Sequence, residues 1–166
     1  VRLSQLVLTA YCIAVHVHVA KKASWWPYCS YTMVGYVLLT LRFALGALGL
    51  STLADALRFP TLAMALITTV LWWLVIMPIM LVCMPGDGRS RRRFINFNFS
   101  FFLVNVHLLN SPLALYDHYS TFRPLVLWDL WLSILLALLY LLFYLLVLDP
   151  AGMHFYIILS PRPWWG

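Results

Sequence analysis

Long apolar runs alternate with short polar or charged segments along the whole chain. A helix that crosses a bilayer needs about 20 largely apolar residues, and five segments meet this requirement. They cover approximately residues 3–20, 28–53, 60–84, 94–116 and 124–148. The pattern therefore predicts an all-α fold, a polytopic membrane helix bundle with about five transmembrane helices.

Charged residues and prolines mark the ends of these predicted helices. The first run stops at Lys21-Lys22, the third ends before the basic run Arg89–Arg93, and the fifth ends at Asp149-Pro150. Proline fixes φ and lacks a backbone donor, so Pro60 suits a helix start. Pro78 lies inside the third run, where the same properties should kink the helix.

The last 18 residues, 149–166, are rich in aromatic residues and proline. The segment is too short and too often interrupted to cross a bilayer, so we expect an interfacial tail. No internal repeat and no low-complexity linker divides the chain. We therefore expect residues 1–166 to form a single transmembrane domain.

Composition agrees with this assignment and excludes several classes of protein. Hydrophobic residues make up 64% of the chain and charged residues 10%, against roughly 45–50% and about 25% in soluble proteins. The net charge is +6, but the basic residues sit between apolar runs and form no face that could follow phosphates, which argues against a nucleic-acid partner. The three cysteines form no CxxC or Cys/His cluster. We expect no metal site and no cofactor.

The basic residues are distributed unevenly between the two sides of the predicted bundle. Five spans place the termini on opposite sides, and cytoplasmic loops carry an excess of Lys and Arg. The side with the first loop, the third loop and the tail has seven such residues, against three on the other side. We therefore expect the C-terminus to be inside. The seven are Lys21, Lys22, Arg89, Arg91, Arg92, Arg93 and Arg162, and the three are Arg2, Arg58 and Arg123.

Arg42 lies about fourteen residues into the second predicted helix, at membrane depth. A guanidinium there must reach the interface, pair with an acid or line a cavity. Asp117 or Asp129 could pair with it from another helix, whereas Asp55 lies too far along the same helix to be a one-turn partner. A buried structural pair and an anchor for a substrate carboxylate both remain open.

The fourth predicted helix carries the most polar residues of any span. His107, Asn110 and Ser111 share a face because they are three and four residues apart. The imidazole should face the bundle, where it could accept a proton. On spacing alone, a core histidine bonded to a neighbouring helix is the favoured interpretation. The polar residues of this segment are Asn96, Asn98, Ser100, Asn105, His107, Asn110, Ser111 and Asp117.

Several short motifs follow one another along most of the chain. An aromatic-rich segment that ends in an aromatic–Thr pair leads into the second predicted helix, which contains a Phe-x-x-Gly pattern. The third has a Phe-Pro dipeptide and an aromatic pair, the fourth has His-x-x-Asn with an acid ten residues after the histidine, and the tail has a glycine followed by a tyrosine. These motifs are Trp25–Thr32, Val37–Gly46, Phe59–Thr61, Leu71–Trp73, Met77-Pro78, His107, Asn110 and Asp117, Gly152–Tyr156, and Trp164-Trp165.

In their order and spacing, these motifs resemble the androgen-induced membrane protein family. The resemblance implies an intramembrane threonine hydrolase that cleaves fatty-acid esters of hydroxy fatty acids. By position, it implies Thr32 as the catalytic nucleophile and His107 as the base, with Asn110, Asp117 and Arg42 in supporting or substrate-facing roles. A neighbouring base is what makes a hydroxyl group nucleophilic, and a site in the membrane suits a two-chain lipid.

A noncatalytic role is the alternative hypothesis. The chain could be an accessory subunit of a large membrane complex of the respiratory or ATP-synthase type, in contact with lipids and neighbouring subunits. The resemblance implies an endomembrane or plasma-membrane location, whereas an accessory subunit of that type implies the mitochondrial inner membrane. A transporter or channel is the weakest hypothesis, since the chain has no repeat and few intramembrane charges.

Overall fold

The computed structural model describes residues 2–84, 88–121 and 123–156, and every regular element in them is a helix. The predicted all-α class is therefore confirmed. The α-helices are α1 (Arg2–Ala23), α2 (Tyr31–Ala47), α3 (Ser51–Val70), α4 (Met77–Cys83), α5 (Gly88–Asn98), α6 (Phe101–Val104), α7 (Asn110–Ser120) and α8 (Leu127–Phe143). Between and after them lie a 3₁₀-helix, η1 (Trp26–Cys29), and three π-helical segments, η2 (Leu71–Ile76), η3 (Asn105–Leu109) and η4 (Tyr144–Leu148).

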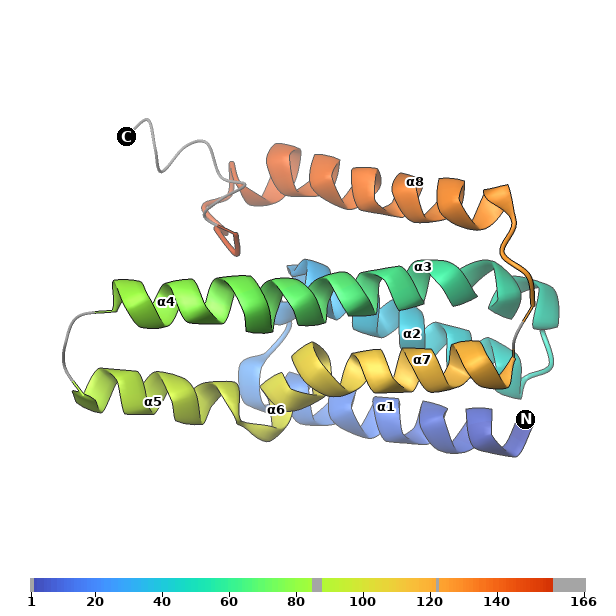
Figure 1. The fold of residues 1–166 in the computed structure, drawn as a ribbon, viewed down its shortest axis with the longest axis horizontal. Coiled ribbons are helices and arrows are strands. Elements are labelled where there is room, and N and C mark those ends of the chain that lie inside the picture. Colours follow the sequence, from blue (N-terminus) through green and yellow to red (C-terminus); the bar gives the residue numbers. More distant parts are fainter. Residues whose placement is uncertain (1, 85–87, 122, 157–166) are drawn as a thin grey trace.

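Helix α3 runs through the middle of the molecule (Figure 1). Helices α2 and α7 pack against it, α1 packs against α2, and α8 lies along the side of α3 away from α7. The main core joins α1, α2, α3 and the α6–α7 segment, and includes the fully buried Cys12, Met33, Phe43 and Val106. A smaller aromatic cluster attaches η4 to the start of α2.

Three helical stretches of the described chain are long and apolar enough to cross a membrane: Arg2–Ala23, Ser51–Cys83 and Leu127–Leu148. A fourth is present if Gly88–Asn98 and Phe101–Ser120, which meet at a bend of 54°, count as one span. Helix α2 is apolar but has 17 residues. Helix length and composition thus give three or four candidate spans, and they do not establish the expected count of five.

The boundary between the second and third helices differs from the prediction. Helix α2 ends at Ala47, and α3 begins at Ser51, whereas a single helix was expected to continue to residue 53 and the next to begin at Pro60. Gly49 makes the turn with φ +79°, a conformation that glycine adopts without steric cost. Pro60 consequently lies inside α3. The apolar pattern continues across the turn, so hydropathy alone does not mark it.

The fourth predicted helix also differs from its expected form, whereas the third contains no break at Pro78. Pro78 follows the π-helical segment η2, and the helix from Ser51 to Cys83 stays continuous. The fourth predicted helix instead breaks at Phe99-Ser100. The Ser100 side chain caps α6 by accepting a hydrogen bond from the Leu103 backbone N–H, so the inner part of this segment starts later than the hydrophobic pattern suggests.

Asp129 anchors the start of α8. Its carboxylate accepts hydrogen bonds from Arg123 Nη1 at 2.9 Å and from the Val126 backbone N–H at 2.9 Å. The hydrogen bond to Asp129 raises the pKa of Arg123, which keeps the guanidinium charged. Arg58 of α3 donates to the backbone carbonyls of Thr121 and Arg123, at 2.6 and 2.8 Å. These bonds attach the α7–α8 connection to α3.

Replacing Asp129 by Asn should lower the thermal stability of the protein in detergent. The amide keeps the size of the side chain but loses the charge opposite Arg123, and breaking a fully buried pair costs about 3–5 kcal/mol. Because Arg123 is 28% exposed, we expect a loss of about 1–3 kcal/mol. Asp55→Asn is the matched control, since the Asp55 side chain is 43% exposed. Equal destabilisation by the two variants would contradict this role for Asp129.

Candidate functional site

Thr32 lies in the first turn of α2. Pro27 is the second residue of η1, and the Ser30 side chain then caps α2 by accepting a hydrogen bond from the Met33 backbone N–H at 3.3 Å. Ser and Pro at these positions favour a helix start. The cap fixes where the helix begins, and Thr32 is buried, with 6% of its surface exposed.

His107 lies in the π-helical segment η3, where the Asn110 backbone N–H bonds to the Asn105 carbonyl five residues earlier. Such segments often occur at functional sites. His107 is 7% exposed. It lies six residues after the first residue of α6, Phe101, or about 9 Å along the helix at 1.5 Å per residue. The bend at Phe99-Ser100 therefore leaves His107 near the same end of the bundle as Thr32.

The structure brings these two predicted site residues together. Thr32 Oγ1 and His107 Nε2 are 3.4 Å apart. This separation is longer than the roughly 2.6–3.2 Å of a well-formed nucleophile–base hydrogen bond, but such bonds are often looser without substrate. A hydroxyl beside an unprotonated imidazole nitrogen is the minimal arrangement for general-base activation.

Two tryptophans of η2 hold the imidazole. Trp72 stacks on His107 with ring centroids 4.2 Å apart and an interplanar angle of 28°. Trp73 Nε1 donates a hydrogen bond to the His107 backbone carbonyl at 3.0 Å. His107 Nδ1 has no hydrogen-bond partner among the described residues. A proton on Nδ1 would leave the Nε2 lone pair facing Thr32.

The C-terminal tail brings Tyr156 close to Thr32. The Tyr144 hydroxyl donates to the Tyr156 carbonyl at 3.1 Å and accepts from the Tyr156 backbone N–H at 3.2 Å. Burial raises the pKa of the Tyr156 phenol, whereas its hydrogen bond to Thr32 acts in the opposite direction. Tyr156 belongs to the tail motif Gly152–Tyr156, and its place beside Thr32 could not be predicted, because nothing in the local spacing indicates that the tail returns to α2.

Asn110 holds two helices together beside this site. It accepts a hydrogen bond from Thr69 Oγ1 at 3.1 Å, and the same hydroxyl lies 2.7 Å from Ser111 Oγ. Ser111 in turn donates to the Ala65 carbonyl at 2.9 Å. These bonds join α7 to α3, so Asn110 supports the helix that carries His107, and its contacts are with α3 rather than with Thr32.

Arg42 and Asp117 lie in a separate cluster. Arg42 is ten residues beyond Thr32 in α2, about 15 Å along the axis. Its Nε atom is 3.1 Å from Asp117 Oδ2, and its Nη2 atom donates to Thr121 Oγ1 at 3.0 Å. The expectation that Asp117 could pair with Arg42 across helices is met. The structure does not bring this pair to Thr32 and His107.

The expectation for Asp55 was wrong. Its Oδ1 atom lies 3.9 Å from Arg42 Nη2, because α2 ends early and α3 then returns beside it. Asp129, the other acid considered for Arg42, pairs instead with Arg123.

Within residues 2–84, 88–121 and 123–156, no group of three or more His, Cys, Asp or Glu residues could hold a metal ion. Arg162 and Trp164-Trp165, which entered the topology and motif arguments, lie outside the described residues. Comparisons with protein-family models, curated proteins and solved structures give no match.

Removing the Tyr144 hydroxyl should release the tail from the bundle. Tyr144→Phe keeps the ring but loses both hydrogen bonds to the Tyr156 backbone. We therefore expect chymotrypsin to cleave faster at Phe155 and Tyr156, and mass spectrometry of the fragments measures the rate. Tyr119→Phe makes the same change on an exposed ring and should cleave like wild type. Unchanged tail protection in Tyr144→Phe would contradict the anchoring role.

Proposed function

We propose that the chain is a five-span membrane protein that hydrolyses lipid esters, with Thr32 as nucleophile and His107 as general base. The observation that carries the proposal is the 3.4 Å contact between Thr32 Oγ1 and His107 Nε2 in a buried site. The resemblance to the androgen-induced membrane protein family points to the same two residues, and it does so from sequence motifs alone. Geometry and motif thus support one assignment independently.

Helix α2 supplies the additional span in this proposal. Its 17 residues extend about 26 Å, slightly less than the roughly 30 Å hydrocarbon core. The segment η1 precedes it, and the Leu48–Leu50 turn extends it on the other side. The bent segment contributes its Phe101–Ser120 part as the fourth span, and α5, with Arg89–Arg93 at its start, lies at the inner interface.

Labelling of single cysteines by a membrane-impermeant maleimide tests this topology. The cysteines replace three exposed residues, as Lys22→Cys, Leu48→Cys and Arg89→Cys. Each is introduced into a protein in which the exposed native Cys83 is replaced by Ser. We expect Leu48→Cys to react from outside, and the other two from the side rich in basic residues. Reaction of Lys22→Cys and Leu48→Cys from one side would contradict a spanning α2.

The chemistry follows from the Thr32–His107 contact. Thr32 Oγ1 attacks the ester carbonyl carbon while its proton passes to His107 Nε2. As the tetrahedral intermediate collapses, the ester C–O bond breaks and the departing oxygen takes the proton from His107, which releases an alcohol and leaves an acyl-Thr32. His107 then deprotonates a water molecule that attacks this acyl group, and the proton returns to Thr32 Oγ1 with release of the carboxylic acid.

The surroundings of Thr32 support a lipid substrate. The Tyr156 phenol, hydrogen bonded to Thr32, would be close enough to donate to the carbonyl oxygen as it gains charge. Beside Tyr156 a hollow of about 290 Å³ is lined by Trp26, Met153, His154 and Phe155. Trp26 and Phe155 stack there at 5.6 Å. This lining is largely apolar and suits an acyl chain that enters from the membrane.

Hydrolysis of a branched fatty-acid ester by purified protein tests the catalytic assignment. Thr32→Ala and His107→Ala should each lower turnover at least about a hundredfold, since the two residues act as a unit. Thr32→Ser keeps a hydroxyl and should retain part of the activity. Thr61→Ala and His18→Ala are matched controls, because Thr61 bonds to its own helix and His18 packs on Phe101. Wild-type turnover in both Thr32→Ala and His107→Ala would eliminate the mechanism.

The accessory-subunit hypothesis has one observation in its favour. Helix α8 buries few residues and presents large apolar side chains outward, among them Leu127, Trp128, Trp131 and Leu138. Such a face suits either lipid or a neighbouring subunit. An inactive purified wild type that copurifies with a stable set of membrane subunits would support this second function over the hydrolase.

A further inference from the structure

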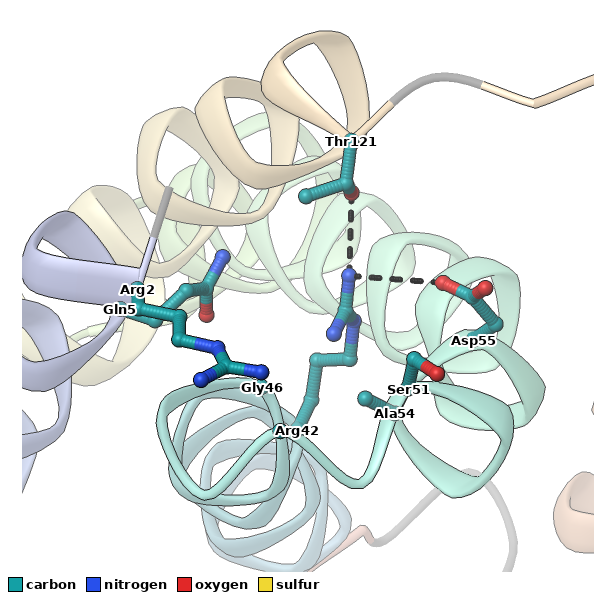
Figure 2. Close-up of a pocket in the computed structure, with 9 residues that line it drawn as sticks. Arg2, Gln5, Arg42, Gly46, Ser51, Ala54, Asp55 and Thr121 are labelled. Carbon is teal, nitrogen blue, oxygen red and sulfur yellow. Dashed lines mark hydrogen bonds and ion pairs between the residues drawn. The ribbon is translucent and has the colours of Figure 1, made fainter.

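A second hollow, of about 290 Å³, lies at the end of the bundle away from Thr32 and His107. Figure 2 shows side chains from α1, α2, the start of α3 and the end of α7 around it. The proposed hydrolase does not use this hollow. Its lining residues are Arg2, Gln5, Arg42, Gly46, Gly49, Ser51, Ala54, Asp55 and Thr121.

Gln5, which lines this hollow, has a side-chain carbonyl oxygen without a hydrogen-bond partner among the described residues. Its Nε2 atom donates to Asp117 Oδ1, and an ionised carboxylate can only accept, so the amide orientation is fixed. The Oε1 atom therefore faces away from Asp117, and it has no hydrogen-bond partner among the described residues although Gln5 is 1% exposed. A Cβ atom at Gly46 would lie 3.1 Å from Oε1. Buried carbonyl oxygens normally have partners, so a ligand donor would satisfy this one.

Two guanidinium groups supply donors on the same side. Arg42 uses Nε and Nη2 for Asp117 and Thr121, and its Nη1 atom would be 3.3 Å from a Cβ at Gly46, beside Gln5 Oε1. Arg2 stands over the α2–α3 turn and, within the described chain, forms no ion pair. The Arg2 charge is therefore available to an anion.

The start of α3 adds further donors. Leu50 occupies the N-cap position and offers no side-chain acceptor, so the first backbone N–H groups of this helix remain open to an anion. Asp55, one turn later, is 43% exposed on its side chain and provides an acceptor at the opposite edge of the hollow. The hollow thus combines donors for an anion with acceptors for a hydrogen-bond donor.

We propose that this hollow binds the headgroup of a phospholipid whose phosphate is followed by a hydrogen-bond donor, such as ethanolamine or glycerol. The phosphate would contact Arg2 and Arg42 Nη1, and the ammonium or hydroxyl group would donate to Gln5 Oε1 and Asp55. The hollow lies where α1 and α3 begin and α2 ends, which is the level of lipid headgroups for helices that span a bilayer. Choline carries no N–H or O–H donor, so phosphatidylcholine cannot satisfy Gln5.

Native mass spectrometry of the detergent-solubilised chain tests the proposal with dioctanoyl phosphatidylethanolamine, phosphatidylglycerol and phosphatidylcholine as probes. Wild type should bind the first two about tenfold more tightly than phosphatidylcholine, the ratio that corresponds to one hydrogen bond. Gly46→Ala fills the space between Gln5 and Arg42 and should abolish the preference. Arg2→Gln removes a charge that faces the phosphate, which the three lipids share, so it should weaken the binding of all three. Gly88→Ala and Arg89→Gln make the same changes at exposed positions. They should leave the lipid preference and the affinity unchanged.

Three results would overturn the proposal. They are equal binding of the three lipids by wild type, an unchanged preference in Gly46→Ala together with an unchanged affinity in Arg2→Gln, and an equal effect of the two control substitutions. Glycerophosphoethanolamine, the same headgroup without acyl chains, is the last probe. Weak binding of this compound supports a membrane lipid as the ligand, whereas binding as tight as that of the lipid would assign the hollow to a soluble phosphodiester instead.

Discussion

A polar group buried inside a protein has no water to bond with, so it must find its partner within the protein. The ion pair between Arg42 of α2 and Asp117 of α7 is the strongest case, and Gln5 of α1 and Thr121 join the same cluster. Because these bonds link different helices, they fix the level at which the helices pack. In our account, that alignment is what brings Thr32 of α2 to the level of His107 at the opposite end of the bundle.

The hydrophobic pattern was sufficient to predict an all-α fold, though not the number of spans, and the scarcity of partners for a buried guanidinium was sufficient to suggest Asp117 or Asp129 for Arg42. The end of α2 at Ala47 and the break at Ser100 were not predictable in this way. Apolar residues continue on both sides of each, so neither hydropathy nor periodicity changes there. The two sites are marked only by Ser100, whose hydroxyl caps α6, and by Gly49, which has a positive φ. Serine and glycine are too common in sequences to locate a helix boundary.

The candidate site was accessible to sequence only in part. Motif order indicated Thr32 and His107, and the structure places their side chains together, while their catalytic roles stay predictions. The contacts around Thr32 and His107 are set by π-helical segments, which carry Trp72, His107 and Tyr144. An extra residue in a turn rotates the following side chains by about 100° relative to an α-helix. Spacing rules for regular helices therefore could not predict the stacking on His107 or the anchoring of the tail.

The claim that Thr32 is a nucleophile activated by His107 is tested most directly by trapping the acyl-enzyme. Purified protein is incubated with an activated fatty-acyl ester and quenched in acid, and its peptides are mapped by mass spectrometry. Our account predicts one acyl group on Thr32 in wild type and none at that position in His107→Ala. Acylation of another residue, or equal acylation of Thr32 in the presence and absence of the imidazole, would contradict it.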